Sequence, residues 1–70
     1  MSFEKKENVK VHANNRILEG RVVDRYIQKT ELDYEGTALI ADASEENPFY
    51  LVELDNGKVE MIAEGALEKF

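Results

Sequence analysis

Apolar and polar residues alternate most clearly near the C-terminal end of the chain, in FYLVELDNGKVEMI. Residues 49–54 are rich in aromatic and β-branched side chains, and Val59 and Met61 then lie between polar neighbours. Both patterns favour β-strands. Asn56 and Gly57 suit a two-residue type I′ turn, because both residue types reach positive φ at low steric cost. The segment therefore predicts an antiparallel hairpin.

The strand period of two assigns faces to this hairpin. One face should carry apolar residues of both strands, namely Tyr50, Val52, Leu54, Val59 and Met61. Phe49 and Leu51 then point to the opposite face. That face is either also buried or an exposed apolar patch for a partner, and we favour burial.

Upstream, residues 8–13 predict a short strand with Val9 and Val11 on one face, followed by a turn at Asn14-Asn15. Residues 16–29 form a long β-branched run interrupted by Gly20. Its apolar positions also fit a helix loosely, but the glycine and the Val-Val pair favour a strand. A glycine inside a strand is typical of a bulge or sharp bend.

Residues 30–36 predict a polar connection closed by a glycine, and residues 37–43 predict another short strand. Pro48 cannot donate to a ladder, so we expect it to start the next strand at a sheet edge. The last residues, AEGALEKF, suit a single 3₁₀ or α turn with Leu67 and Phe70 folded back onto the sheet. Residues 1–7 are expected to form a flexible tail.

Five short strands and a terminal helical turn predict an all-β fold, a small five-stranded antiparallel barrel formed by one domain over residues 8–70. The long early strand with its glycine, then GTALIA, then YLVELDNGKVEMIA ending in ALEKF, resemble the SH3-like barrels of small bacterial and phage proteins and of the KOW and Tudor groups. In those barrels a hairpin with a tight turn leads into a 3₁₀ turn and a last short strand or tail. The KOW group's basic, glycine-rich first loop is replaced here by HANNR.

Composition narrows the class of protein. A chain of 70 residues without cysteine has neither a disulfide nor a thiolate, which suits the cytoplasm. No segment reaches the roughly 18 apolar residues of a membrane helix. The net charge of −6 is uneven, since seven of the nine basic residues lie in residues 1–29 and eleven of the fifteen acidic residues lie in residues 30–70.

The residues offer little for catalysis. His12 is the only histidine, and no metal-binding or phosphate-binding motif is present. Ser2 and Ser44 have neither the context of a nucleophile nor a base beside them. We therefore expect no enzyme activity, no metal and no cofactor.

Binding to a protein partner is the favoured function. Tyrosine combines an apolar ring with a hydroxyl, and carboxylates beside it suit a basic partner. The candidate contact residues lie in the predicted loops and at the start of the hairpin: Tyr26, Asp33, Tyr34, Glu35, Glu45, Glu46, Phe49 and Tyr50. Burial of Tyr26 and Tyr50 in the core is the alternative for those two. A narrower hypothesis is that the acidic half imitates nucleic acid and blocks a nucleic-acid enzyme, as some phage proteins do.

The alternative function is RNA or DNA binding by the basic half of the chain, with Arg21 and Arg25 on one strand face. The candidate residues are Lys10, Arg16, Arg21, Arg25 and Lys29. The overall negative charge opposes this function, because each phosphate contact must form against it. A third possibility is an oligomer that pairs through the edge strand after Pro48.

Overall fold

The structure is a computed structural model that describes residues 2–70. The described chain forms strands and one 3₁₀ turn, which are β1 (Asn8–Ala13), β2 (Arg16–Tyr26), β3 (Thr30–Tyr34), β4 (Thr37–Ala41), β5 (Phe49–Leu54), β6 (Val59–Ala63), η1 (Glu64–Ala66) and β7 (Leu67–Lys69). The prediction of an all-β fold is confirmed. Among the described residues, no helix has the length and apolar character needed to cross a membrane.

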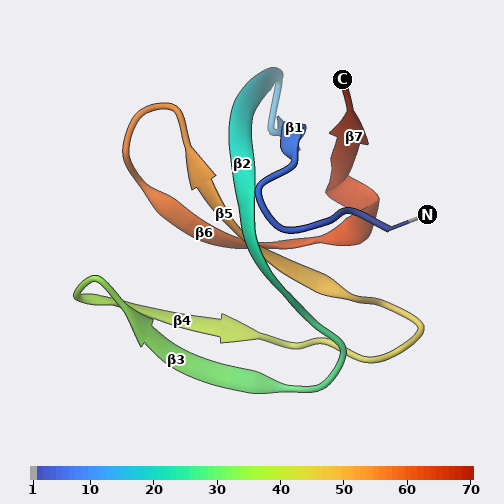
Figure 1. Cartoon of the computed structure of the whole chain (residues 1–70), viewed down its shortest axis with the longest axis vertical. Coiled ribbons are helices and arrows are strands. Elements are labelled where there is room, and N and C mark those ends of the chain that lie inside the picture. The colour runs from blue at the N-terminus through green and yellow to red at the C-terminus, as the bar shows by residue number, and fades with distance from the viewer. Residues whose placement is uncertain (1) are drawn as a thin grey trace.

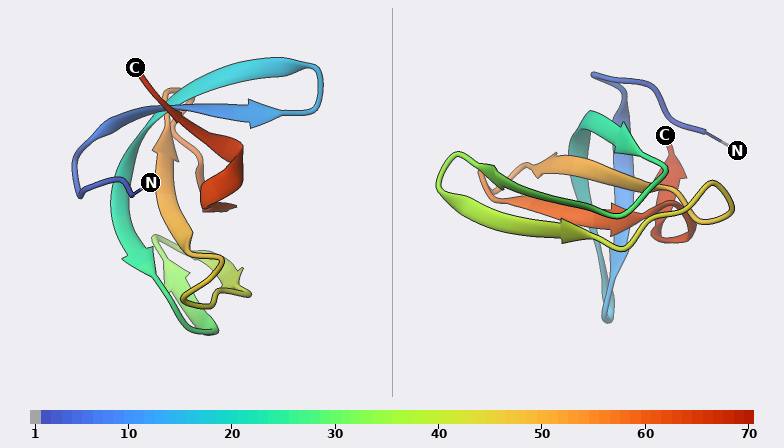
Figure 2. Two further views of the ribbon diagram at one scale, coloured as in Figure 1. Left: turned by 90° about the vertical axis from the view of Figure 1, so that its right-hand side faces the viewer. Right: turned by 90° about the horizontal axis from the view of Figure 1, so that it is seen from below.

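Five strands form one antiparallel sheet in the order β6-β5-β2-β1-β7, and β3 and β4 form a separate two-stranded ribbon (Figure 1). The long β2 pairs with β1 through its first half and with β5 through its second half. It therefore links the two parts of the sheet, which turn away from one another in Figure 2. No ladder joins the ribbon to the sheet in the described chain, so the strands do not close into a barrel.

The main core lies on the concave side of this bent sheet. It is formed by buried residues from the N-terminal segment and all five strands of the sheet: Phe3, Val9, Val11, Val22, Tyr50, Val52, Leu54, Ile62 and Leu67. On the opposite face of β5, Leu51 is only 1% exposed. The ribbon covers this face, with β4 lying against β6 and with Ala41 and Ala43 buried. Burial of the second hairpin face is confirmed for Leu51, and Phe49 is half-buried.

The β5–β6 hairpin closes with a three-residue loop, one residue longer than predicted. Glu53 lies opposite Val59, and the Leu54 amide donates to the Lys58 carbonyl over 2.8 Å. Within the loop only Gly57 has a positive φ, at +88°. A type I′ turn needs positive φ at two successive residues, whereas a three-residue loop needs it only at the last. The predicted turn type is therefore wrong.

The extra loop residue exchanges the faces of β6. Tyr50 lies opposite Ile62, and Leu51 lies opposite Met61. Because side chains alternate along a strand, a shift of one residue moves every side chain to the other face. Val59 and Met61 thus share the face of Leu51, not the predicted face of Tyr50.

Residues 30–34 form strand β3, where a polar connection was expected. Thr30, Leu32 and Tyr34 are half-buried, whereas Glu31 and Asp33 are exposed, which is the alternation of a strand with one covered face. The chain then turns through Glu35 and Gly36, which have φ of +50° and +83°. Positive φ at both positions makes this two-residue loop a type I′ turn.

A bulge in β2 separates two arginines that were predicted to share a face. The register with β5 slips by one residue at Val23, so that Arg21 lies opposite Glu53 whereas Arg25 lies opposite Tyr50. Glu53 and Tyr50 point to opposite faces of β5 because an odd number of steps separates them. The predicted common face of Arg21 and Arg25 is therefore wrong.

Gly20 lies at a close approach of two strands, and the bulge of β2 lies elsewhere. A Cβ atom there would come within 2.7 Å of Val52 Cγ1 and 2.8 Å of the Glu53 carbonyl oxygen. The absence of a side chain allows β2 to approach β5 closely where Gly20 pairs with Leu54.

Strand β5 is an interior strand of the sheet, between β6 and β2. Pro48 precedes its first residue, is buried, and accepts a hydrogen bond of 2.9 Å from the Glu64 amide. Proline at the start of a strand leaves the ladder intact, because its missing N–H lies outside it. The predicted edge strand after Pro48 is therefore wrong, because both edges of β5 are already paired.

Residues 3–7 pack against the sheet and do not form the expected free tail. Phe3 is 3% exposed, and its ring meets the Tyr50 ring edge-on, with centroids 5.5 Å apart. The Lys6 amide donates to the Val22 carbonyl, and the Val22 amide donates to the Glu7 carbonyl. The part of the predicted tail at residue 1 lies outside the described residues.

At the other end, η1 confirms the predicted helical turn, and Leu67 is buried as expected. The following strand β7, which pairs with β1, was not among the five predicted strands. Phe70 is 66% exposed and does not fold onto the core.

Candidate interaction surface

The outward face of the ribbon presents an exposed apolar side chain among carboxylates. Glu31 lies opposite Ile40, and Asp33 lies opposite Ala38, so these four side chains share one face. All four residues are exposed, and Ile40 is 61% exposed. We call Glu31, Asp33, Ala38 and Ile40 the ribbon face.

The segment that carries the ribbon face has side-chain charges of one sign. From Thr30 to Gly57 the sequence contains no lysine or arginine. Glu35 at the tip of the ribbon and Asp42 after β4 add two further exposed carboxylates. Acidic side chains therefore surround Ile40 within its own segment of the chain.

The predicted acidic contact residues fall into two separate regions. Asp33 and Glu35 lie at the tip of the ribbon, whereas Glu45 and Glu46 lie in the loop between β4 and β5. Strand β4 runs between these regions, and its five residues span roughly 16 Å at the usual rise of a strand. Figure 1 shows the tip and this loop at opposite ends of β4. The structure therefore does not bring the four carboxylates together.

Three of the predicted aromatic residues are half-buried beside the ribbon. Tyr26 lies opposite Phe49 in the β2–β5 ladder, on the face that the ribbon covers. Burial raises the pKa of Tyr26, and the Asp24 carboxylate and the Tyr34 hydroxyl raise it further. Tyr26 and Tyr34 are thus close enough to influence each other. Each leaves only part of its side chain exposed to solvent.

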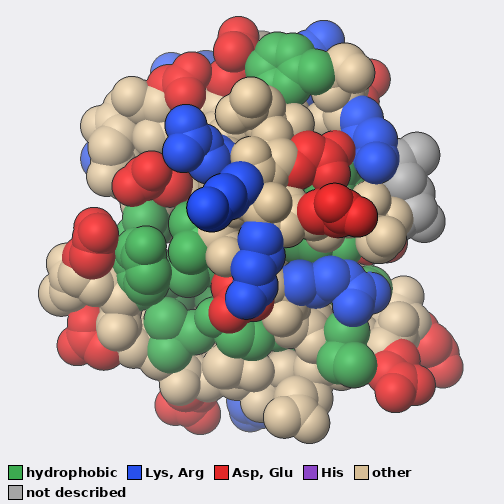
Figure 3. Space-filling model, viewed as in Figure 1, with side chains coloured by type: hydrophobic (Ala, Val, Ile, Leu, Met, Phe, Trp, Pro, Cys, Tyr) green, Lys and Arg blue, Asp and Glu red, His purple; other side chains and the backbone are tan. Residues whose placement is uncertain are grey.

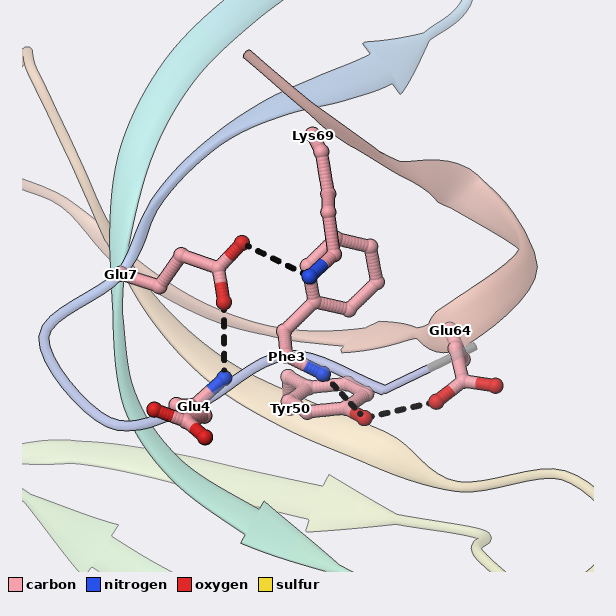
Figure 4. A network of polar contacts seen from close by, with 6 residues as sticks. All are labelled: Phe3, Glu4, Glu7, Tyr50, Glu64 and Lys69. Atoms are coloured by element: carbon pink, nitrogen blue, oxygen red, sulfur yellow. Dashed lines mark hydrogen bonds and ion pairs between the residues drawn. The ribbon is translucent and has the colours of Figure 1, made fainter.

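Tyr50 is a core residue, so its predicted contact with a partner is wrong. Its relative exposure is 0%. Its hydroxyl donates to Glu64 Oε2 over 2.6 Å and accepts from the Phe3 amide over 3.2 Å, as Figure 4 shows. It also accepts from Arg25 Nε over 3.1 Å. This network ties the N-terminal segment, β2, β5 and η1 together.

Burial raises the pKa of Tyr50, and its hydrogen bond to Glu64 raises it further. The hydrogen bonds from the Phe3 amide and Arg25 act in the opposite direction, because donors stabilise the phenolate. The net direction is upward, and the hydroxyl stays protonated as the donor to Glu64.

The predicted nucleic-acid residues are dispersed over the sheet. Arg16 begins β2, and Lys29 follows its end. Lys10 lies between Glu19 and Glu68 in the β1 ladders, and its Nζ is 5.6 Å from the centre of the Phe70 ring. Two neighbouring carboxylates reduce the positive charge that Lys10 presents to a phosphate.

Three cationic residues belong to β2 or to the N-terminal segment that bonds to it. The Lys6 amide donates to the carbonyl of Val22, and Lys5 Nζ is 3.6 Å from Asp24 Oδ1, next to Arg25 in the chain. We call Lys5, Lys6 and Arg25 the basic band. Figure 3 shows Lys and Arg side chains gathered across the middle of one face of the molecule, over β2.

Sequence reasoning missed Glu31 and Ile40, because it placed residues 30–36 in a loop. The available signal was the alternation TELDY before Glu35-Gly36. This alternation predicts a hairpin of β3 and β4, in which Ile40 lies beside acidic side chains.

His12 Nε2 is 3.1 Å from Glu68 Oε1 on the exposed surface. Among residues 2–70, no group of three or more His, Cys, Asp and Glu side chains is arranged to hold a metal ion. Comparisons with protein-family models, with curated proteins and with solved structures find no match to this chain.

Proposed function

We propose that this protein is a non-enzymatic interaction module whose ribbon binds a basic surface of a protein partner. The observation that carries the proposal is the exposed Ile40 opposite Glu31, beside Asp33, in a segment without a cation. Apolar surface supplies affinity when it is buried against a partner. The carboxylates select a basic partner and speed its association.

The proposal assigns the fold to the SH3-like class and the protein to the cytoplasm. The order of the C-terminal elements supports the fold, because the β5–β6 hairpin leads into η1 and then the short strand β7. The absence of cysteine suits the cytoplasm. A bacterial or phage origin, and inhibition of a nucleic-acid enzyme by the acidic surface, are the narrower form of this proposal.

A pull-down from a lysate of the source cells tests the proposal, with and without nuclease and at two salt concentrations. The ribbon variant is Glu31→Lys/Asp33→Lys, and the matched control Glu45→Lys/Glu46→Lys makes the same charge change in the other acidic region. We expect a stoichiometric protein partner that survives nuclease and is lost only with the ribbon variant. A partner retained equally by both variants would overturn the assignment to the ribbon.

The basic band favours a second candidate function, the binding of RNA or DNA. Lys5 and Lys6 are consecutive residues of the segment that bonds to β2, and Figure 3 shows Lys and Arg side chains gathered on one face of the molecule. This function predicts that the same pull-down recovers nucleic acid at low salt. The nucleic acid should be lost at higher salt and with the variant Lys5→Glu/Lys6→Glu. In that case no partner protein should remain bound after nuclease treatment.

A further inference from the structure

Strand β3 has one edge without a strand partner. It pairs with β4 on one side, and no other strand of the described chain pairs with it. Unpaired N–H and C=O groups along such an edge can bond to a strand from another chain.

The turn of the ribbon determines which backbone groups point outward. Tyr34 and Thr37 flank the type I′ turn and form the hydrogen-bonded pair next to it. Bonded and non-bonded pairs then alternate along an antiparallel ladder. The pairs of Asp33 with Ala38 and of Glu31 with Ile40 are therefore non-bonded. The N–H and C=O groups of Glu31 and Asp33 point to the free edge of β3.

We propose that the free edge of β3 binds an extended basic segment of a protein partner as an added strand. This inference rests on the proposed function and specifies how the ribbon would recognise its partner. Side chains of an added strand alternate between the two faces of the ribbon. Those beside Glu31 and Asp33 would be lysine or arginine. Those on the other face, beside Leu32, would be apolar.

Charge selects this occupant over a second copy of the same chain. Two copies of β3 joined edge to edge would bring Glu31 and Asp33 of one copy beside the same carboxylates of the other. Like charges on neighbouring strands destabilise the pairing. The same carboxylates attract lysine or arginine at alternate positions of a foreign strand.

The first probe is the synthetic peptide acetyl-KVKVKVK-amide, titrated into the full chain and followed by calorimetry and by NMR hydrogen exchange. The control acetyl-KPKPKPK-amide has the same charge but favours the polyproline II helix, whose three residues per turn do not match the two-residue period of a strand. We expect only the valine peptide to bind. We also expect slower exchange of the Glu31 and Asp33 amides, whereas the Leu32 and Tyr34 amides, already bonded within the ribbon, should change little.

Asp33→Pro and Asp33→Ala separate backbone pairing from charge. Both remove the carboxylate, but only proline removes the N–H that points to the free edge. Since that N–H is not used within the ribbon, its loss should weaken peptide binding roughly tenfold beyond Asp33→Ala. Glu31→Pro and Glu31→Ala repeat the comparison if Asp33→Pro fails to fold.

Equal binding of the proline and alanine variants, or of the two peptides, would overturn strand addition. So would a failure of the chain to bind the valine peptide. The proposed function would still stand if Glu31→Lys/Asp33→Lys abolished capture of the cellular partner. Unchanged capture with that charge reversal would overturn the ribbon's function as well.

Discussion

The Tyr50 hydroxyl donates a hydrogen bond of 2.6 Å to the Glu64 carboxylate and so joins the interior strand β5 to the turn η1. Because the same oxygen accepts from the Phe3 amide and from Arg25 Nε, one buried hydroxyl links four parts of the chain. The ribbon lies outside this network. Stability and the proposed binding can therefore be tested at separate residues.

Replacing Tyr50 with phenylalanine should lower the free energy of unfolding by about 1–3 kcal/mol, since two of the lost bonds, those with Glu64 and Arg25, have a charged partner. Urea unfolding at pH 7 measures the change. Tyr34→Phe is the matched control, because it removes a hydroxyl from a half-buried ring outside the network. Its effect should stay within about 0.5 kcal/mol. Equal effects of the two variants would contradict a special role for Tyr50.

The raised pKa of Tyr50 also predicts alkaline sensitivity. A folded-state pKa above the unfolded value of 10.0 means that the fold favours the protonated hydroxyl. This contribution to stability is complete below pH 10 and is lost as the pH rises through the folded-state pKa. The difference in unfolding free energy between wild type and Tyr50→Phe should therefore shrink above pH 10. Urea titrations from pH 8 to pH 11 measure it, and a constant difference would contradict the prediction.

Phe3→Ala should destabilise the protein by about 3–5 kcal/mol, the usual range for truncating a buried phenylalanine. That is a large fraction of the roughly 5–15 kcal/mol that holds a small domain folded. Phe70→Ala is the control, because Phe70 is 66% exposed. Thermal unfolding followed by circular dichroism compares the two. Similar melting temperatures would mean that the N-terminal segment contributes little to the core.

Gly20→Ala should cost about 1–3 kcal/mol, because the new methyl group would meet backbone and side-chain atoms of β5. Gly65→Ala is the matched control, since a Cβ at Gly65 would meet nothing within 4 Å. Urea unfolding of both variants measures the difference. An unchanged free energy of unfolding for Gly20→Ala would show that β2 and β5 can move apart at Gly20 without loss of stability.

Glu35→Asn should stabilise the ribbon by a few tenths to about 1 kcal/mol, because asparagine accepts positive φ more readily than glutamate. Glu35 has a φ of +50° and precedes Gly36 in the turn. Hydrogen exchange of the Leu32 amide reports on ribbon opening. Faster exchange in the variant would contradict the assigned turn.

Much of the β-structure was predictable, because its signals are local. The alternation in residues 49–54, the turn at Asn14-Asn15 and the β-branched run after it predicted three strands that the structure contains. Glycine and asparagine favour turns through their own backbone preferences, so the positions of the turns depend on few neighbouring residues. The same local reasoning failed at β3, because TELDY has a single aliphatic residue and was taken as polar.

Register was decided by single residues. One additional residue in the loop before Lys58 moved Met61 to the face of Leu51, and the bulge at Val23 separated Arg21 from Arg25. Because side chains alternate along a strand, each shift of one residue moves the following side chains to the other face of the sheet. Alternation within a strand predicts which of its own residues share a face. It does not predict which residues of a neighbouring strand lie on that same face.

The candidate site was predictable in part. Asp33 and Glu35 lie on the ribbon as acidic, exposed residues, but Glu45 and Glu46 lie at the far end of β4 and Tyr50 is buried. Ile40 lies opposite Glu31 because the two-residue turn between β3 and β4 fixes their register, and the pattern within either strand alone does not determine that pairing.

The sequence by itself determined an all-β chain, its turn residues and the acidic character of its C-terminal half, because these follow from local backbone preference and composition. Only the tertiary structure decided which strand is central, that Phe3 completes the core, and that Ile40 is exposed among carboxylates. Those properties depend on contacts between residues distant in the chain. Such contacts form only when the whole core assembles.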